Sequence, residues 1–178
     1  MMNREARPAQ LAVFAALLMA GLAMSSSARA DCFRSAAQIH HVDHRLLRAI
    51  AKVESGTKHG YNPEAVNPQS GALGVMQIMP TNFAALRKFD ISEQDLHDPC
   101  TNINTGAWVL TQFLRQYGPT WRAVGAYGVG NCKSAKCEAQ RATYAAKVKA
   151  AWQKMKVEQA KKPPVDVAQA TTTTSVVE

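Results

Sequence analysis

The chain has 178 residues, a formal net charge of +8 and 47% hydrophobic residues, which fits one globular domain with additional segments at its ends. Its Lys and Arg residues are spread along the chain and form no nucleic-acid-binding motif, so we predict no nucleic-acid partner. The basic balance is typical of a protein that meets an anionic polymer or an envelope surface.

Residues 1–30 are typical of a secretory signal peptide. Arg4 and Arg7 form a basic start, an apolar run extends from Leu11 to Met24, and small residues flank the arginine of Ala28-Arg29-Ala30, as at a cleavage site. The apolar run is shorter than the roughly 20 residues of a membrane-spanning helix, and an uncleaved anchor is the alternative. We therefore expect a periplasmic protein that is exported by a cleavable signal peptide.

Four cysteines follow the expected cleavage site: Cys32, Cys100, Cys132 and Cys137. An even number of cysteines in an exported protein favours disulfide bonds, and four cysteines allow three pairings. The short separation of Cys132 and Cys137 favours a local bridge, which leaves Cys32 to pair with Cys100. The second pair is not a CxxC motif and no histidine lies near it, so we predict no metal there.

Helical patterns cover most of the chain from Cys32 to Trp152. Asp43 is a candidate N-cap for a helix over His44–Ser55 that Gly56 ends. Gly118 and Pro119 stop an amphipathic helix over Asn102–Tyr117, and Thr120 can cap the next helix. The remaining predicted helical segments are 33–41, 80–89, 92–96, 121–127 and 135–157.

The segment Thr57–Gly74 is rich in glycine, proline and asparagine, which predicts a small irregular or β-containing lobe beside the helical body. A long loop inside a compact domain is often functional. Beyond Lys161 the apolar period is lost. We therefore expect a signal peptide over 1–30, a mainly α (α+β) domain over 31–156 and a disordered tail over 157–178.

Glu54 is the candidate catalytic residue. It ends an apolar helix face immediately before the irregular lobe. A carboxyl group at the edge of an apolar core loses water, which disfavours its charged form and raises its pKa. Such a group stays protonated near neutral pH, as a general acid must. A solvated glutamate at a helix end is the structural alternative.

Three short motifs occur in a fixed order along the chain: Glu54-Ser55, Gly74-Val-Met-Gln77 and Ala126-Tyr127. Together they resemble the lytic transglycosylases of lysozyme-like fold, in particular the small single-domain variety that accompanies bacterial secretion and conjugation machines. The resemblance extends from about Cys32 to Trp152. It implies a helical body, a smaller lobe and a cleft between them with Glu54 at its base.

The resemblance also implies a reaction. These enzymes cut the bond between N-acetylmuramic acid and N-acetylglucosamine in peptidoglycan and leave a 1,6-anhydro sugar. Glu54 would act first as acid and then as base, without the carboxylate pair of ordinary glycosidases; Glu64 in the lobe is the nearest rival for a second role. No cofactor or metal is implied. The expected partners are peptidoglycan strands and components of a secretion or conjugation apparatus. We expect the protein to act as a monomer.

The resemblance assigns supporting roles to four further residues. Ser55 would help to hold the Glu54 carboxyl group, and Gln77 would hydrogen-bond the substrate. Met76 would pack against a sugar, and Tyr127 would offer its hydroxyl to Glu54 or to the substrate N-acetyl group. Each of these residues also has a plain structural interpretation, as a helix-end or core side chain.

One position departs from the family pattern. The family usually has Asn after the tyrosine, and this chain has Gly128, which removes an amide that could contact substrate. Two alternatives to the transglycosylase therefore stay open at this point. One is a hydrolysing muramidase that uses the same Glu54. The other is a non-catalytic peptidoglycan-binding assembly protein, for which Gly128 is the only indication.

Overall fold

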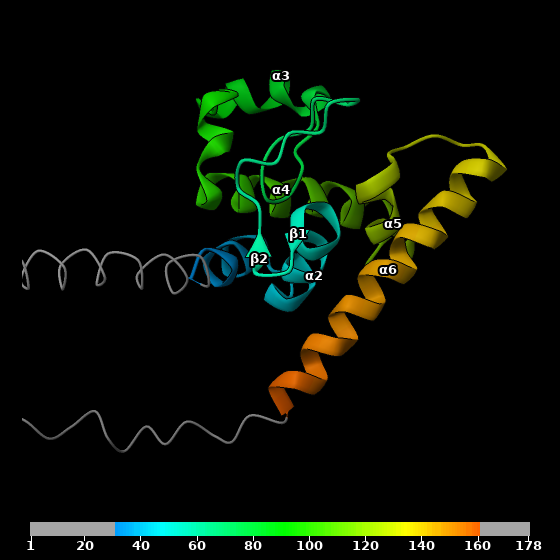
Figure 1. The fold of residues 1–178 in the computed structure, drawn as a ribbon. Helices are drawn as coiled ribbons and strands as arrows, with labels where there is room; N and C mark the ends of the chain where they lie inside the picture. The colour runs from blue at the N-terminus through cyan, green and yellow to red at the C-terminus, as the bar shows by residue number, and fades with distance from the viewer. Residues whose placement is uncertain (1–30, 161–178) are drawn as a thin grey trace, which may run out of the picture.

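A computed structural model describes residues 31–160 of the protein (Figure 1). The expected signal peptide and residues 161–178 of the expected tail lie outside the described residues. In the described part of the chain, no helix is both long and apolar enough to cross a membrane.

Helices form the body of the molecule. Residues 31–40 are helical and are followed by α2 (His44–Ser55), α4 (Pro99–Tyr117), α5 (Trp121–Val129) and α6 (Ala135–Ala160). The long helix α6 runs along α5 and α2, and α4 packs against α5 (Figure 1). Their shared core consists of fully buried apolar side chains, among them Leu47, Ile50, Ile103, Leu110 and Val148. The prediction of a mainly helical, lysozyme-like body is confirmed.

Helix α2 begins and ends at the predicted residues. The Asp43 carboxylate caps it by accepting a hydrogen bond from the Arg45 backbone N–H at 2.8 Å. Gly56 follows the last helical residue, but its backbone is extended rather than left-handed, and it begins strand β1. The glycine is needed for another reason: a Cβ at this position would overlap the Lys52 carbonyl one turn earlier.

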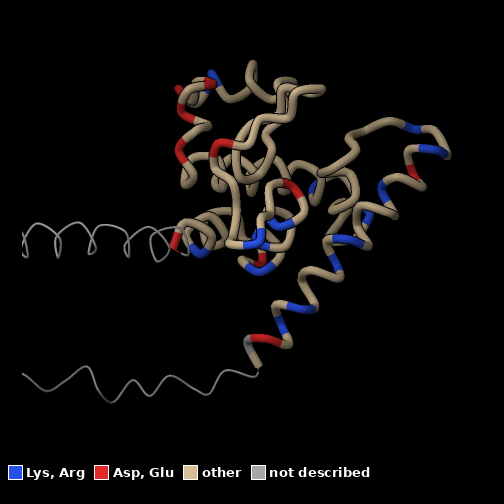
Figure 2. Tube along the Cα trace, in the orientation of Figure 1, with Lys and Arg blue, Asp and Glu red and all other residues tan. Residues whose placement is uncertain are grey.

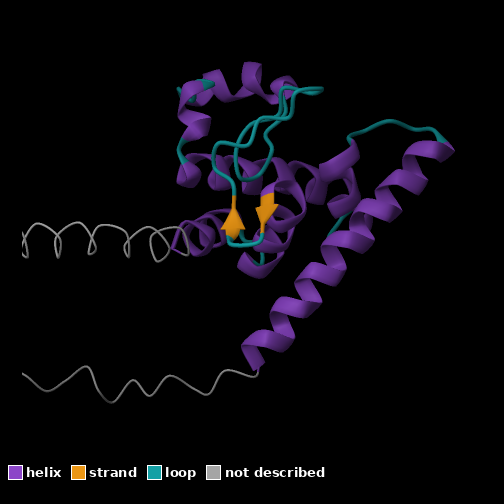
Figure 3. Cartoon of the chain, in the orientation of Figure 1, coloured by secondary structure: helices purple, strands orange, loops and turns teal. Residues whose placement is uncertain are grey.

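The lobe is irregular and contains a very small sheet, as predicted. Strands β1 (Gly56–Thr57) and β2 (Gly60–Tyr61) pair antiparallel, and isolated bridges join Leu73 to Val66 and to Ile78. Figure 3 shows this part of the chain as mostly loop, leading from the end of α2 towards α3. The lobe therefore connects directly to the helix end that carries Glu54.

Short helical turns complete this side of the molecule. The predicted helix over 80–89 is divided into η1 (Pro80–Asn82), α3 (Phe83–Leu86) and η2 (Arg87–Phe89), and the next turn is η3 (Gln94–His97). Helix α4 starts three residues earlier than predicted, with Asp98 as its cap. Helix α6 continues to Ala160, so residues 157–160 are helical rather than part of a tail. Nothing in Val157-Glu-Gln-Ala160 breaks a helix.

Both predicted disulfide bonds are present. Cys32–Cys100 ties the first helical residues to the start of α4, with the Cα atoms 5.1 Å apart. Cys132–Cys137 closes the connection between α5 and α6, with a Cα separation of 6.0 Å. The first bridge spans 68 residues and the second only five, so the first restricts the unfolded chain more.

Candidate active site

Glu54 lies in the last turn of α2, where α6 crosses it. Its side chain is half-buried, and its Oε1 accepts a hydrogen bond from the Tyr144 hydroxyl of α6. Burial is the larger influence and raises the pKa of Glu54 above its usual value, while the bond from Tyr144 lowers the pKa and offsets part of that rise. The carboxyl group thus has the environment expected of a general acid.

Tyr144 donates a hydrogen bond to Glu54, and no sequence motif predicts this contact. It lies on the inner face of α6, four residues before the fully buried Val148. An aromatic residue that only packs in the core would have the same helical spacing, so the sequence does not distinguish the two roles. Burial, together with the nearby Glu54 charge, raises the pKa of Tyr144 far above its ordinary range, so its hydroxyl remains a donor. Because 90 residues separate the two side chains, only the packing of α6 over α2 brings them together.

Tyr127 approaches Glu54 but does not bond it. Its hydroxyl donates to the Met76 carbonyl at 2.7 Å, which links α5 to the Gly74–Gln77 turn. Burial raises the pKa of Tyr127 well above its usual value, and the negative charge of Glu54 adds to the rise. The expected bond from Tyr127 to Glu54 is therefore replaced by a bond that supports the turn.

Ser55 also supports the turn rather than the carboxyl group. Its hydroxyl donates to the Val75 carbonyl at 2.7 Å and lies 3.4 Å from the Ala51 carbonyl oxygen. Ser55 therefore makes no bond to the Glu54 carboxyl group and can help to hold it only through the backbone. Because Ser55 adjoins Glu54, its bond to Val75 fixes the helix end that carries the acid against the turn that carries Gln77.

Met76 is a core residue. Its side chain is fully buried, and a Cβ on Gly106 of α4 would lie only 2.7 Å from the Met76 Cβ and Cγ. The side chain cannot reach a sugar, so the expected stacking role is wrong. The Met76 backbone N–H donates to the side-chain oxygen of buried Asn102 at 2.8 Å. This bond holds the turn in the orientation that places the Met76 side chain in the core.

Gln77 has a left-handed backbone, with a φ of 49°. Its side-chain amide donates to the Ala65 carbonyl at 3.1 Å and to the Gly74 carbonyl at 3.0 Å. These bonds orient the side chain and leave its Oε1 as the group that can accept a hydrogen bond from a ligand. The contact between Gln77 and substrate stays a prediction, and this oxygen is the atom that would make it.

Gln77, Tyr127 and Gly128 line a cavity of about 540 Å³. Its other walls come from the turn after the lobe, from α4 and from the end of α5: Ile78, Met79, Thr81, Asn82, Val109, Gln112, Phe113, Gln116, Val129, Gly130 and Asn131. None of these lining side chains is an Asp, Glu, Lys or Arg. Amides and apolar faces together suit a neutral ligand with hydroxyl and acetamido groups.

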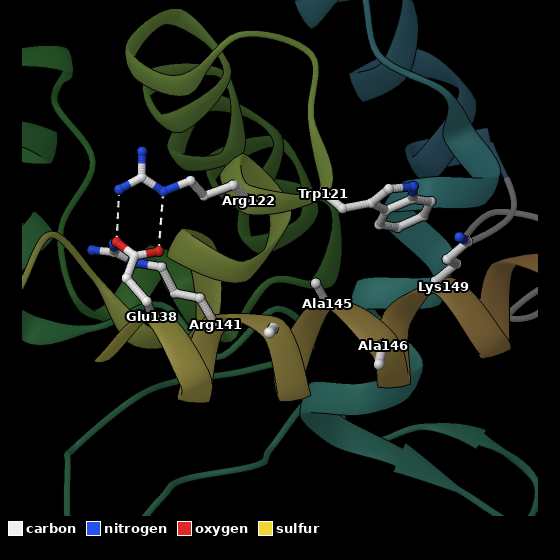
Figure 4. Close-up of a pocket in the computed structure, with 8 residues that line it drawn as sticks. Trp121, Arg122, Glu138, Arg141, Ala145, Ala146 and Lys149 are labelled. Carbon is white, nitrogen blue, oxygen red and sulfur yellow. Dashed lines mark hydrogen bonds and ion pairs between the residues drawn. The ribbon is translucent and has the colours of Figure 1, made fainter. Parts of the chain in front are cut away.

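A second hollow, of about 470 Å³, has a different character (Figure 4). It lies between α5 and α6, and three of its four charged groups bond one another: Arg122 and Arg141 both pair with Glu138. The fourth, Lys149, lies over the Trp121 ring. Buried Arg141 also donates to the carbonyls of Gly130 and Cys132. This hollow is therefore held by an internal ion network that fixes the connection between the two helices.

Glu64 does not share the environment of Glu54. Its side chain is 73% exposed, and its Oε2 lies 3.6 Å from His97 Nδ1. An exposed carboxyl lacks the desolvation that a general acid requires at neutral pH. In residues 31–160, moreover, no three His, Cys, Asp or Glu side chains gather as metal ligands.

A helical body, a small irregular lobe, a half-buried carboxyl group where the two meet and a neutral cavity lined by Tyr127 are typical of a glycan-cleaving enzyme of lysozyme-like fold. The family profile described as "Transglycosylase SLT domain" matches residues 31–150. The chain therefore belongs to the transglycosylase SLT domain family and is a peptidoglycan lytic transglycosylase.

Three bacterial proteins are similar in sequence to this chain. The X polypeptide of Escherichia coli is 39% identical over 120 residues, which are 66% of this chain and 70% of the relative. Invasion protein IagB of Salmonella typhimurium (strain SL1344) is 37% identical over 135 residues, 74% of this chain and 81% of that one. Protein IpgF of Shigella flexneri is 37% identical over 121 residues, 66% and 76% of the two chains.

Among solved structures, an inactive variant of lytic transglycosylase Slt from Pseudomonas aeruginosa matches with a TM-score of 0.58 and 24% identity. The match covers 78% of this chain but only 25% of the larger protein, so this chain corresponds to one part of it. At this identity the likeness shows the fold, which is the lysozyme-like fold expected from the sequence.

Proposed function

We propose that the protein cleaves the bond between N-acetylmuramic acid and N-acetylglucosamine in peptidoglycan and leaves 1,6-anhydro ends, with Glu54 as the single acid and base. The observation that carries the proposal is the environment of this carboxyl group. Burial and the bond from Tyr144 are the causes of its pKa shift, and no carboxylate of residues 31–160 is among them. A glycosidase that works by a carboxylate pair holds the second group within about 10 Å.

In the first step protonated Glu54 donates its proton to the glycosidic oxygen, and the bond from that oxygen to C1 of the muramic sugar breaks. The N-acetyl group of the substrate stabilises the positive charge at C1. The Glu54 carboxylate then accepts the proton of the C6 hydroxyl while O6 bonds to C1. The proton returns to Glu54, so the cycle consumes no water.

Tyr144 contributes between the two steps. The Glu54 carboxylate exists only after the first proton transfer, and the Tyr144 hydroxyl donates to it. A hydrogen bond to a charged acceptor is about twice as strong as a neutral one, so this contact favours the charged state. Tyr144 also holds the carboxyl group in one orientation for both transfers.

Mass spectrometry of the soluble muropeptides tests the reaction. We expect the mature protein to release anhydro products, one water lighter than hydrolysis products, and Glu54→Gln to release none. Hydrated products from the wild type would identify a hydrolysing muramidase that uses the same residue. Binding to peptidoglycan without turnover would identify the non-catalytic alternative.

We further propose that the protein acts in the periplasm and opens the wall locally for an envelope-spanning secretion or conjugation apparatus. The signal-like pattern of residues 1–30 and the two disulfide bonds support an oxidising, exported location. The name of one relative, invasion protein IagB, supports the link to such an apparatus.

Cell fractionation with N-terminal sequencing tests this location. We expect a periplasmic protein that begins at Asp31. A protein that retains residues 1–30 and sediments with membranes would instead support an uncleaved anchor. For the second half of the proposal, deletion of the gene should reduce assembly of the apparatus, and the wild-type gene, but not Glu54→Gln, should restore it.

A further inference from the structure

Gly128 faces the ring of Tyr144 across the contact between α5 and α6. A Cβ built on Gly128 would lie 2.7 Å from the Tyr144 Cγ and closer still to Cδ2 and Cε2. Carbon atoms in favourable contact are separated by about 3.5–4.0 Å. No side chain larger than hydrogen fits at residue 128 while Tyr144 keeps this position.

Rotation of the ring does not remove the overlap. Cγ lies on the axis about which the ring turns, so a ring flip leaves its distance from residue 128 unchanged. Relief requires a different χ1 angle for Tyr144 or a movement of α6. Either change would withdraw the hydroxyl from Glu54, to which it donates in the structure.

Helix α6 has little freedom to move away. Gly125, one turn earlier on α5, lets the helices approach so closely that a Cβ there would lie 2.5 Å from the Arg141 carbonyl oxygen. Arg141 in turn bonds the Gly130 and Cys132 carbonyls, and Cys132–Cys137 closes the connection. The separation of α5 and α6 is thus fixed on both sides of Gly128.

We propose that Gly128 is a positioning residue: the absence of a side chain there allows Tyr144 to stand where it holds the Glu54 carboxyl group. Tyr144 can then occupy its position only because residue 128 is glycine. The replacement of the family's usual Asn by Gly128 therefore does not indicate that the active site has been lost. The proposal rests on the proposed function only in its kinetic consequence, since the contact itself belongs to the folded protein.

The kinetic test uses Gly128→Asn, Gly128→Ala, Tyr144→Phe and the double variant Gly128→Ala/Tyr144→Phe. We expect each single variant to lower kcat roughly 10- to 100-fold with little change in KM, because small misplacements of a reacting group cost this much. The double variant should be no slower than Tyr144→Phe, because the hydroxyl contact is already gone. Wild-type activity in Gly128→Asn, or additive losses in the double variant, would overturn the proposal.

A titration of Glu54 by NMR on the labelled protein reads the same contact without turnover. Because the bond from Tyr144 lowers the pKa of Glu54, Gly128→Ala and Tyr144→Phe should both raise that pKa, and to the same extent. Gly125→Ala is the matched control, since it crowds the same two helices one turn away; it should lower the Tm and leave the Glu54 titration unchanged.

The kinetic assay and the Glu54 titration distinguish a failure of the proposed function from a failure of the proposed role of Gly128. If the wild type shows no turnover, the proposed function fails, and the titration still decides the role of Gly128. An unchanged Glu54 titration in Gly128→Ala would overturn the role of Gly128. An equal shift in Gly125→Ala would also overturn it, because the effect would then come from general separation of the helices.

Discussion

The two tyrosines near Glu54 have different tasks, although both are polar side chains in an apolar surrounding. Tyr127 donates to a backbone carbonyl, that of Met76, and so holds a turn in place. Tyr144 donates to the Glu54 carboxyl group and lowers its pKa. Loss of the Tyr127 hydroxyl would leave a carbonyl without its partner, which costs about 1–3 kcal/mol if it is buried. Loss of the Tyr144 hydroxyl would appear mainly in catalysis.

Glu54 itself has a cost in stability. Because burial raises its pKa in the folded protein, the folded state binds this proton more tightly than the unfolded state. The stabilisation is complete below the unfolded pKa and is lost as the pH rises through the folded pKa. Above the folded pKa, the folded protein therefore carries a charge in a place that favours a neutral group.

We expect Glu54→Gln to abolish turnover and to raise the Tm at pH values above the folded pKa of Glu54, because the amide is neutral at every pH. The advantage over wild type should disappear as the pH falls below about 4.5, where the wild-type group is protonated in both states. Thermal denaturation across this pH range measures the difference. A variant that is less stable than wild type above the folded pKa would show that the carboxylate contributes favourable bonds that outweigh its desolvation.

At the scale of elements, one buried amide joins α4 to the turn that follows the lobe. Asn102 of α4 is fully buried; it donates to the carbonyls of Leu73 and Leu96 at 2.9 Å each and accepts from the Met76 N–H. Gly74 approaches it so closely that a Cβ would lie 2.7 Å from the Asn102 Cγ. The turn that carries Gln77 is therefore positioned by α4 as much as by the lobe.

Replacement of Asn102 by Ala should destabilise the protein by about 3 kcal/mol or more, since it leaves several buried backbone groups without partners. We also expect substrate KM to rise, because the Gln77 turn loses its support. Denaturant unfolding and steady-state kinetics measure the two effects. Asn104→Ala is the control: Asn104 lies two residues later on α4 and is half-buried, and its side chain bonds His40, so its loss should cost little stability.

At the scale of the whole molecule, local signals were sufficient for much of the fold. The caps Asp43 and Thr120 mark the starts of α2 and α5, because a cap bond involves only neighbouring residues. Long-range contacts were not predictable in this way. The partnership of Tyr144 with Glu54 and the burial of Met76 depend on how α6 and α4 pack, which no spacing along the chain expresses. The position of Glu54 at the end of α2 was predictable, whereas its surroundings required the fold.

Charge is also arranged at this scale. Exposed Lys147, Lys149, Lys154 and Lys156 follow the second half of α6 (Figure 2), whereas the side chains that line the cavity beside Tyr127 are uncharged. The basic helix can attract the carboxylates of peptidoglycan stem peptides over several ångströms, and added salt screens such attraction. The cavity, in contrast, recognises its ligand through short-range contacts that salt affects little.

We therefore expect salt to raise the KM for intact sacculi and to leave the cleavage of a soluble, peptide-free glycan fragment nearly unchanged. Assays of both substrates between low and high ionic strength measure this difference. The variant Lys154→Gln/Lys156→Gln should reduce the salt dependence on sacculi, and Lys58→Gln, on the exposed turn between β1 and β2, is the control. Equal salt dependence on both substrates would mean that charge acts within the cleft itself, and an unchanged dependence in the α6 variant would place the attraction on another face of the molecule.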